Sequence, residues 1–165
     1  MINNIKAITE HDGKHISVVG DTYRIVISGK ETQEDYAIID MLVPPGGGPP
    51  PHAHPLFHEL FYVVDGEVEF KTETGRHIAK KGDLINIPKG GAIQCFENIS
   101  KSMAHLLCTV VPAGLDDFFL EIGTPVKEGE FLPAPHPDEE GLKKLQAIAE
   151  KYGQVLYPPD YFLNI

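Results

Sequence analysis

Short apolar runs, many of them rich in β-branched residues, recur along most of the chain and are interrupted by Gly, Pro or Asp-Gly. Runs of this length and composition predict β-strands, whose side chains alternate between a buried and an exposed face. We expect strands in these regions, with a break at Gly20 in the first: 16–28, 36–43, 57–64, 67–71, 84–87, 93–96 and 103–111. Many short strands at regular spacing are typical of a β-sandwich or β-barrel, so we predict an all-β fold.

Glycine-containing dipeptides mark the turns between these strands. Asp65-Gly66 separates two apolar runs and predicts a β-hairpin, because Gly accepts the positive φ that a tight turn requires. Thr74-Gly75 and Lys81-Gly82 indicate the next turns. The sequence shows no internal repeat, which favours one barrel over two in tandem.

Helical patterns appear only after the last predicted strand. Residues 114–122 (GLDDFFLEI) predict a short helix with acidic residues near its positive N-terminal end. Residues 138–152 predict a longer helix, capped by Asp138 and ended by Gly153. One apolar face of this helix is expected to pack on the barrel or on a partner subunit: Leu142, Leu145, Ala149 and Tyr152. The stretch 123–137, rich in Pro and Gly, predicts an extended surface segment.

The segment Pro44–Pro51 (PPGGGPPP) allows two interpretations, a linker between domains or a tight loop that delivers the next residues to a site. Only 43 residues precede it, and the strands among them need partners to bury their apolar faces, which favours the loop. We therefore predict a single domain over residues 1–165. Its barrel core would span about 36–112, followed by a C-terminal helical extension at about 113–165.

The charge of the chain excludes two classes of partner. The chain has 165 residues and a formal net charge of −10, with 14 Lys and Arg against 24 Asp and Glu. Nucleic acids and anionic membranes are bound mainly through clustered Lys and Arg. We therefore expect no nucleic acid and no membrane as a partner, and a small molecule instead.

The cysteines and the N-terminal sequence indicate the cellular compartment in which the protein is expected. Cys95 and Cys108 form neither a CxxC metal pair nor a disulfide framework, so we expect reduced, buried thiols, as is usual in cytoplasm. The N-terminal residues hold no apolar run long enough for a signal peptide, and no stretch approaches a membrane span. We therefore expect a cytoplasmic protein.

His52, His54 and Glu59 are the candidate metal ligands. Residues two apart in an extended strand point to the same face, so His52 and His54 can aim both imidazoles at one point. A carboxylate from Glu59 on a neighbouring strand would complete a face of two imidazoles and one carboxylate. This face suits divalent Fe, Ni, Mn, Cu or Zn and leaves coordination positions open. The alternative is a solvated pair of loop histidines without a metal.

Two segments resemble the motifs of the cupin superfamily. Residues 46–66 (GGGPPPHAHPLFHELFYVVDG) resemble the first motif, G(X)5HXH(X)3-4E(X)6G, with every fixed position filled. Residues 82–98 (GDLINIPKGGAIQCFEN) resemble the second, G(X)5PXG(X)2H(X)3N, except at its histidine. Strict spacing puts Ile93 at that position, whereas counting back from Phe96 puts Gln94 there. We prefer Gln94, because it alternates onto one face with Phe96 and Asn98.

The resemblance is to small single-domain cupins, and among them to the quercetin 2,3-dioxygenase-like group. It implies a cupin β-barrel (a jelly roll) that binds one divalent metal ion per chain. The ligand set that it implies is His52, His54, Glu59 and Gln94. The amide oxygen of Gln94 would bind a transition metal more weakly than imidazole does. The implied activity is a metal-dependent dioxygenase for a small aromatic or enolic substrate, in which Glu59 could also act as a base.

Inward-facing residues of the predicted barrel would line the substrate pocket: Met41, Phe57, Phe61, Phe96 and His105. Two other functions stay open, because fold does not imply function. One is a non-catalytic barrel that binds a small molecule, which Gln94 favours. The other is a metal-dependent isomerase or epimerase of sugars or keto acids, which the scarcity of Arg disfavours. We also expect a homodimer, in which residues up to Ser28 cover the edge strands of a second subunit.

Overall fold

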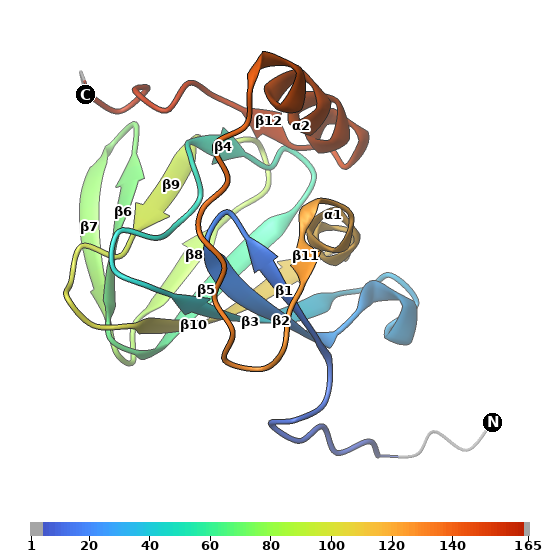
Figure 1. Ribbon diagram of the computed structural model, residues 1–165. Helices are drawn as coiled ribbons and strands as arrows, with labels where there is room; N and C mark the ends of the chain where they lie inside the picture. Colours follow the sequence, from blue (N-terminus) through green and yellow to red (C-terminus); the bar gives the residue numbers. More distant parts are fainter. Residues whose placement is uncertain (1–4, 164–165) are drawn as a thin grey trace.

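The computed structural model describes residues 5–163 and shows two antiparallel β-sheets packed around one core (Figure 1). The seven-stranded sheet has the order β11 (Thr124–Pro125), β1 (Lys14–Val18), β2 (Asp21–Ile27), β3 (Ala37–Val43), β10 (Ala104–Val111), β5 (His58–Asp65) and β8 (Leu84–Ile87). The five-stranded sheet has the order β12 (Val155–Leu156), β4 (His52–Ala53), β9 (Gln94–Glu97), β6 (Glu67–Thr72) and β7 (Gly75–Lys80). The predicted all-β barrel is confirmed.

Alternation along the strands builds the core between the sheets. Every second residue of β3 and of β10 is buried. Three aromatic rings join the sheets at ring-centroid distances of 5.4 to 5.5 Å: Phe61 from one sheet, and Phe70 and Phe96 from the other. Burial of each such side chain stabilises the fold by about 1.5–3 kcal/mol.

The hairpin predicted at Asp65-Gly66 is wrong. β5 pairs with β10 and β8, whereas β6 pairs with β7 and β9, so this dipeptide carries the chain from one sheet to the other. Gly66 is still needed, because its φ is +78° and a Cβ would lie 2.9 Å from the backbone oxygen of Met103. Long-range strand pairing overrides the local signal here, whereas Thr74-Gly75 does connect the paired strands β6 and β7.

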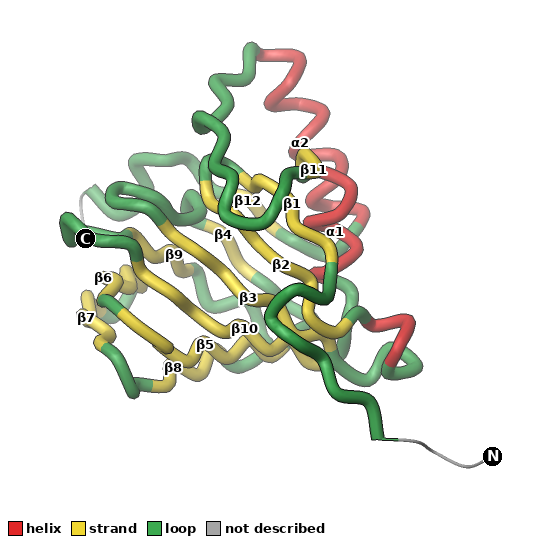
Figure 2. The backbone as a smooth tube through the Cα atoms, turned by 60° about the horizontal axis from the view of Figure 1, so that its bottom comes forward, coloured by secondary structure: helices red, strands yellow, loops and turns green. Residues whose placement is uncertain are grey.

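Both predicted helices are present, and they lie together on one side of the barrel (Figures 1 and 2). They are α1 (Leu115–Ile122) and α2 (Glu139–Lys151), and the carboxylate of Asp138 caps α2 by accepting from the amide of Gly141 at 2.9 Å. Ala149 is fully buried, but Leu142 is 54% exposed, because the core contacts of α2 lie in its second half. Neither helix in the described part of the chain is long and apolar enough to cross a membrane.

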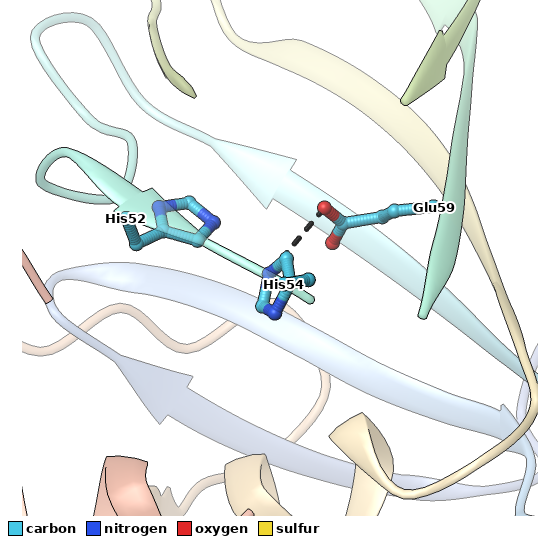
Figure 3. A group of neighbouring side chains, drawn as sticks. All are labelled: His52, His54 and Glu59. Atoms are coloured by element: carbon cyan, nitrogen blue, oxygen red, sulfur yellow. Dashed lines mark ion pairs between the residues drawn. The ribbon is translucent and has the colours of Figure 1, made fainter. Parts of the chain in front are cut away.

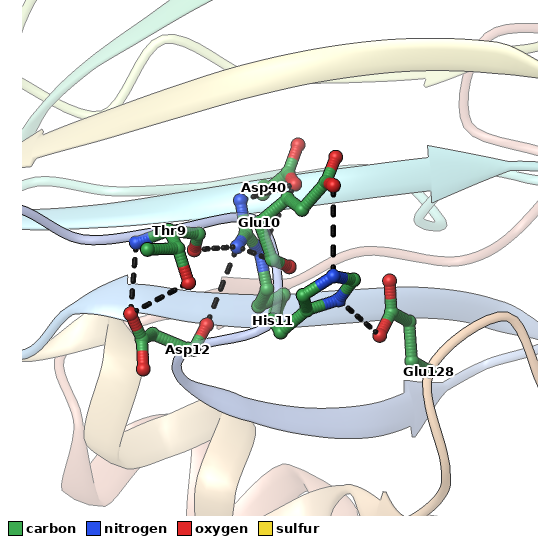
Figure 4. A network of polar contacts seen from close by, with 7 residues as sticks. Thr9, Glu10, His11, Asp12, Asp40 and Glu128 are labelled. Atoms are coloured by element: carbon green, nitrogen blue, oxygen red, sulfur yellow. Dashed lines mark hydrogen bonds and ion pairs between the residues drawn. The ribbon is translucent and has the colours of Figure 1, made fainter.

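The N-terminal strands pair within the chain, with β2 beside β3 and β1 between β2 and β11; a short 3₁₀ helix, η1 (Gly29–Glu31), follows β2. Arg24 on β2 pairs with Asp40 on β3 at 3.0 Å. Nη1 of Arg24 also donates to three backbone carbonyls of the preceding segment, those of Thr9, Glu10 and Asp12 (Figure 4). Strands of the same chain thus occupy the place where we expected those of a partner, and the homodimer stays a prediction.

Candidate metal centre

The segment 44–51 is a loop between β3 and β4, and the strands before and after it contribute to one hydrophobic core. The backbone of Asn98 fastens it, because Gly46 donates to the carbonyl of Asn98 at 2.8 Å and the amide of Asn98 donates to Gly47 at 2.9 Å. Gly48 has a φ of +131°, and a Cβ there would lie 2.1 Å from the backbone oxygen of Phe96. Only glycine fits so close an approach, which seats β4 against β9.

His52 and His54 are both buried, and their ring centroids lie 4.8 Å apart (Figure 3). Nδ1 of His52 lies 2.8 Å from the carbonyl oxygen of Pro50. Because a carbonyl only accepts, Nδ1 carries the proton and Nε2 keeps its lone pair. This is the tautomer of a metal ligand whose orientation is fixed from behind. Both ring nitrogens of His54 are buried without a hydrogen-bond partner.

Glu59 approaches the histidines from β5 (Figure 3). Its Oε2 lies 3.5 Å from Nε2 of His54, and its Oε1 accepts a weak hydrogen bond from the thiol of Cys108 at 3.7 Å. Possible ligand atoms of His52, His54 and Glu59 all lie within 4.8 Å of one another. The structure thus brings together the three residues that the sequence singled out.

Gln94 completes the group. It lies directly opposite His52 in the pairing of β9 with β4 and is 1% exposed. Its amide nitrogen donates to Nε2 of His52 at 2.9 Å and to Oε2 of Glu59 at 3.4 Å, whereas its Oε1 is buried without a partner. Ile93, which strict motif spacing would have selected, packs in a separate apolar cluster with Ala53 and Phe162. Gln94, and not Ile93, therefore lies beside His52 and Glu59.

Burial sets the protonation of the metal-free centre. It lowers the pKa of His52 below its usual range, and it lowers the pKa of His54 to about 2, with a further contribution from His52. Burial raises the pKa of Glu59 to about 8, against the hydrogen bond from Cys108. The contact between His54 and Glu59 is therefore one between neutral groups near pH 7, not a charged pair.

This donor set fits a divalent cation. Two neutral imidazoles and one carboxyl group place possible ligand atoms close together, and the carboxyl group can lose its proton to become a ligand. A cation would satisfy one orphaned ring nitrogen of His54 and, after rotation of the amide, the orphaned Oε1 of Gln94. His52, His54 and Glu59 would hold the metal, and Gln94 would be a fourth oxygen donor or hydrogen-bond to a ligand.

A cavity of about 60 Å³ opens beside this centre. The residues of the centre that line it are His52, His54 and Glu59, and the remaining walls are almost entirely apolar. The barrel contributes Val18, Val19, Tyr23, Met41, Pro49, Pro50, Phe61 and Phe96, and the C-terminal extension contributes Phe118, Phe119, Ile122, Leu145, Gln154 and Leu156. Among the described lining residues none is Lys or Arg. The extension thus closes the mouth of the barrel over the centre.

Two of the predicted pocket residues lie elsewhere. Met41, Phe61 and Phe96 do line the cavity. His105 points to the opposite face of β10, where it contacts Asp40, because the neighbours on either side, Ala104 and Leu106, take the inward positions. Phe57 is buried with its ring 5.9 Å from that of His54, but it does not line the cavity, because it comes just before β5 and packs toward α1.

Residues 39–110 match the family model Cupin_2, a cupin domain. Probable germin-like protein subfamily 2 member 5 of Arabidopsis thaliana is 43% identical over 68 residues, which is 38% of this chain and 32% of that protein. Quercetin 2,3-dioxygenase of Bacillus subtilis is 22% identical over 122 residues, which is 74% of this chain and 35% of that enzyme. The matches therefore span about a third of the length of these curated relatives.

Among solved structures, KdgF from Halomonas sp. has the same fold. It superposes with a TM-score of 0.60 at 18% sequence identity, over 69% of this chain and 99% of that chain.

Proposed function

The chain belongs to the cupin superfamily, and we propose that it is a metal-dependent dioxygenase acting on a small aromatic or enolic substrate. The observation that carries the proposal is a buried face of two neutral imidazoles and one carboxyl group that opens into an apolar cavity. A face of this kind with open positions is typical of non-haem iron oxygenases. The similarity to quercetin 2,3-dioxygenase over 74% of the chain supports the same class.

The cavity favours a small and uncharged substrate. A phosphorylated or multiply charged substrate needs cationic partners, and the described lining residues offer no Lys or Arg. The volume of about 60 Å³ is well below the roughly 150 Å³ of an engineered cavity that holds benzene. A compact enol therefore needs the C-terminal extension to shift slightly, whereas a flavonol would need a much larger displacement of it.

Different side chains of the site would have different roles in the reaction. His52, His54 and Glu59 would hold the metal ion, which when bound would polarise a substrate oxygen and supply the redox chemistry. Met41, Phe61 and other apolar side chains of the wall exclude water from the reacting groups. Glu59, once ionised, provides a negative charge that partly balances the charge of the cation in this buried setting.

Metal content tests the proposal. We would measure it by plasma mass spectrometry in untagged wild type, in Glu59→Gln and in Glu97→Gln, a surface carboxylate exchanged in the same way. We expect about one metal ion per chain in wild type and in Glu97→Gln, lost in Glu59→Gln. The loaded wild type should consume oxygen with 2,4-pentanedione or another enol. Full oxygen uptake by metal-free His52→Ala protein would overturn the proposal.

A non-catalytic barrel that binds a small molecule is the second candidate. The hydrogen bond from Gln94 to Nε2 of His52 favours it, because this amide occupies the lone pair that a metal needs. Binding of enols or small aromatics without oxygen uptake, in protein loaded with each metal in turn, would select this candidate. The isomerase or epimerase finds less support, since the described lining holds few groups to orient a polar sugar.

A further inference from the structure

Asp21 and Tyr23 form a second polar pair beside the cavity. Both lie on the inner face of β2, two residues apart, and only 1% and 3% of their surface is exposed. The hydroxyl of Tyr23 donates to Oδ2 of Asp21 at 3.2 Å. Among the described residues that line the cavity, Tyr23 alone carries a hydroxyl group. Asp21 lies behind it and does not line the cavity itself.

Asp21 has unused hydrogen-bonding capacity. Its Oδ1 is buried without a partner, although buried carboxylate oxygens are almost always satisfied. The loop that carries the histidines is shaped around it, because a Cβ at Gly47 would lie 2.4 Å from Oδ1 of Asp21. A purely structural role does not explain this carboxyl group. It is buried, a glycine of the loop makes room for it, and it reaches the cavity through the hydroxyl of Tyr23.

We propose that Asp21 is a general base of this site that acts through the hydroxyl of Tyr23 on an enolic substrate in the cavity. The inference rests on the proposed function for its substrate class. Tyr23 is the residue that touches the substrate, and Asp21 is a positioning residue that receives the proton at one remove. Glu59 is then free to serve the metal centre alone.

The proton transfer balances without a further reagent. The O–H bond of the enol breaks and its proton bonds to the oxygen of Tyr23. The original hydroxyl proton of Tyr23 passes to Oδ2 of Asp21. The substrate becomes an enolate, Tyr23 is neutral before and after, and Asp21 changes from carboxylate to carboxylic acid. When the product takes up a proton, the transfer runs in reverse. Tyr23 donates its hydroxyl proton to the product and receives a proton from Asp21.

The surroundings of the pair suit this role. Burial raises the pKa of Asp21 to about 7, against the hydrogen bond from Tyr23 and the influence of the nearby amide of Gly48. A base is most effective when its pKa lies near the working pH. Burial and Asp21 together raise the pKa of Tyr23 well above its usual range, so Tyr23 relays a proton rather than losing one. Glu59 on β5 and Cys108 on β10 raise the pKa of Tyr23 further through their charges.

Enolate formation by a bound probe tests the relay. Zn²⁺-loaded protein has no metal absorbance, so the ultraviolet band of bound 2,4-pentanedione enolate can be followed from pH 5 to 9. We expect wild type to form the enolate with a midpoint near 7, and Asp21→Asn and Tyr23→Phe each to form about tenfold less at pH 7.5. The control is Tyr152→Phe, which also removes a hydroxyl that donates to a carboxylate, that of Glu121, but outside the cavity lining.

Wild-type enolate profiles in both variants would overturn the relay, and so would the absence of bound enolate in wild type at every pH. Oxygen uptake is scored separately, so the relay and the dioxygenase function can fail independently. If Asp21→Asn does not fold, a second experiment on the wild type takes the place of that variant. It uses Zn²⁺-loaded protein labelled with ¹³C at Cζ of tyrosine. The ¹³Cζ signal of Tyr23, assigned with Tyr23→Phe, should shift as Asp21 titrates near pH 7. A signal that does not respond in this range would overturn the relay.

Discussion

The side-chain amide of Gln94 donates a hydrogen bond to Nε2 of His52 across 2.9 Å. This nitrogen carries the lone pair of His52, because Nδ1 is committed to the carbonyl oxygen of Pro50. A metal ion and the amide nitrogen of Gln94 therefore compete for the same atom. Binding of a cation requires the amide to rotate, which would turn its unpartnered Oε1 toward the centre.

Replacing Gln94 with His should strengthen metal binding. The substitution removes the competing amide donor and supplies an imidazole, which transition metals prefer to an amide oxygen. We expect the dissociation constant for Zn²⁺ or Ni²⁺ to fall by about 10–100-fold, measured by competition with a chromophoric chelator. The control is Gln146→His, which places the same residue at a half-buried position of α2 that does not line the cavity. An unchanged or weaker affinity in Gln94→His would show that Gln94 does not limit the site.

Metal affinity should rise with pH through the titration of Glu59. Burial raises the pKa of Glu59 to about 8 in the metal-free protein, so below that pH a cation must displace a proton from the carboxyl group. Each unit of pH from 6 to 8 should increase the apparent association constant about tenfold, with a plateau above. His54 adds nothing in this window, because burial lowers its pKa to about 2. Calorimetric titrations in buffers of different ionisation enthalpy would count the released proton, and zero protons released at pH 6.5 would contradict this prediction.

The parts of the site that could be predicted are those encoded locally. His52 and His54 share a face because they lie two residues apart in extended chain, and motif spacing identified Glu59. Gln94 followed from alternation with Phe96 along one strand. These relations need no knowledge of tertiary packing.

The parts that could not be predicted depend on long-range packing or on ambiguous alternation. Tyr23 and Gln154 reach the cavity from an N-terminal strand and from the C-terminal extension, and no local pattern joins them to the histidines. His105 was misplaced because both faces of β10 carry apolar residues, so Leu106 and Leu107 alone do not show which face points inward. The hairpin prediction at Asp65-Gly66 was wrong because of long-range packing, since the two strands that it connects pair with other strands.

The side chain of Leu145 should control the size of ligand that the cavity accepts. It lines the cavity from α2 and is only partly buried, so Leu145→Ala enlarges the space at a cost of about 1–2 kcal/mol, less than for a fully buried leucine. We expect this variant to improve binding of 1-phenyl-1,3-butanedione relative to 2,4-pentanedione by about fivefold or more, because the larger ligand gains buried apolar area.

Leu142→Ala provides the matched control for that comparison. It makes the same truncation on the same helix, but Leu142 is 54% exposed and does not line the cavity. Its stability should change by less than about 0.5 kcal/mol and its preference between the two diketones should not change. Equal shifts in both variants would mean that the ligand enters by another route.

Gly48→Ala should disable the metal centre by displacing the loop that carries His52. A Cβ at this position would lie 2.1 Å from the backbone oxygen of Phe96, and the φ of +131° is one that L-residues rarely adopt. Since neither backbone segment can move without breaking hydrogen bonds, we expect a loss of about 3 kcal/mol or more in the free energy of unfolding.

Gly46→Ala is the control that separates backbone strain from steric clash. Gly46 also has a positive φ of +77°, but a Cβ there would meet nothing within 4 Å. It should cost only about 1–2 kcal/mol and keep its metal. Denaturant unfolding and metal content measure both effects, and full metal occupancy in Gly48→Ala would show that the approach of this loop to β9 does not hold the centre together.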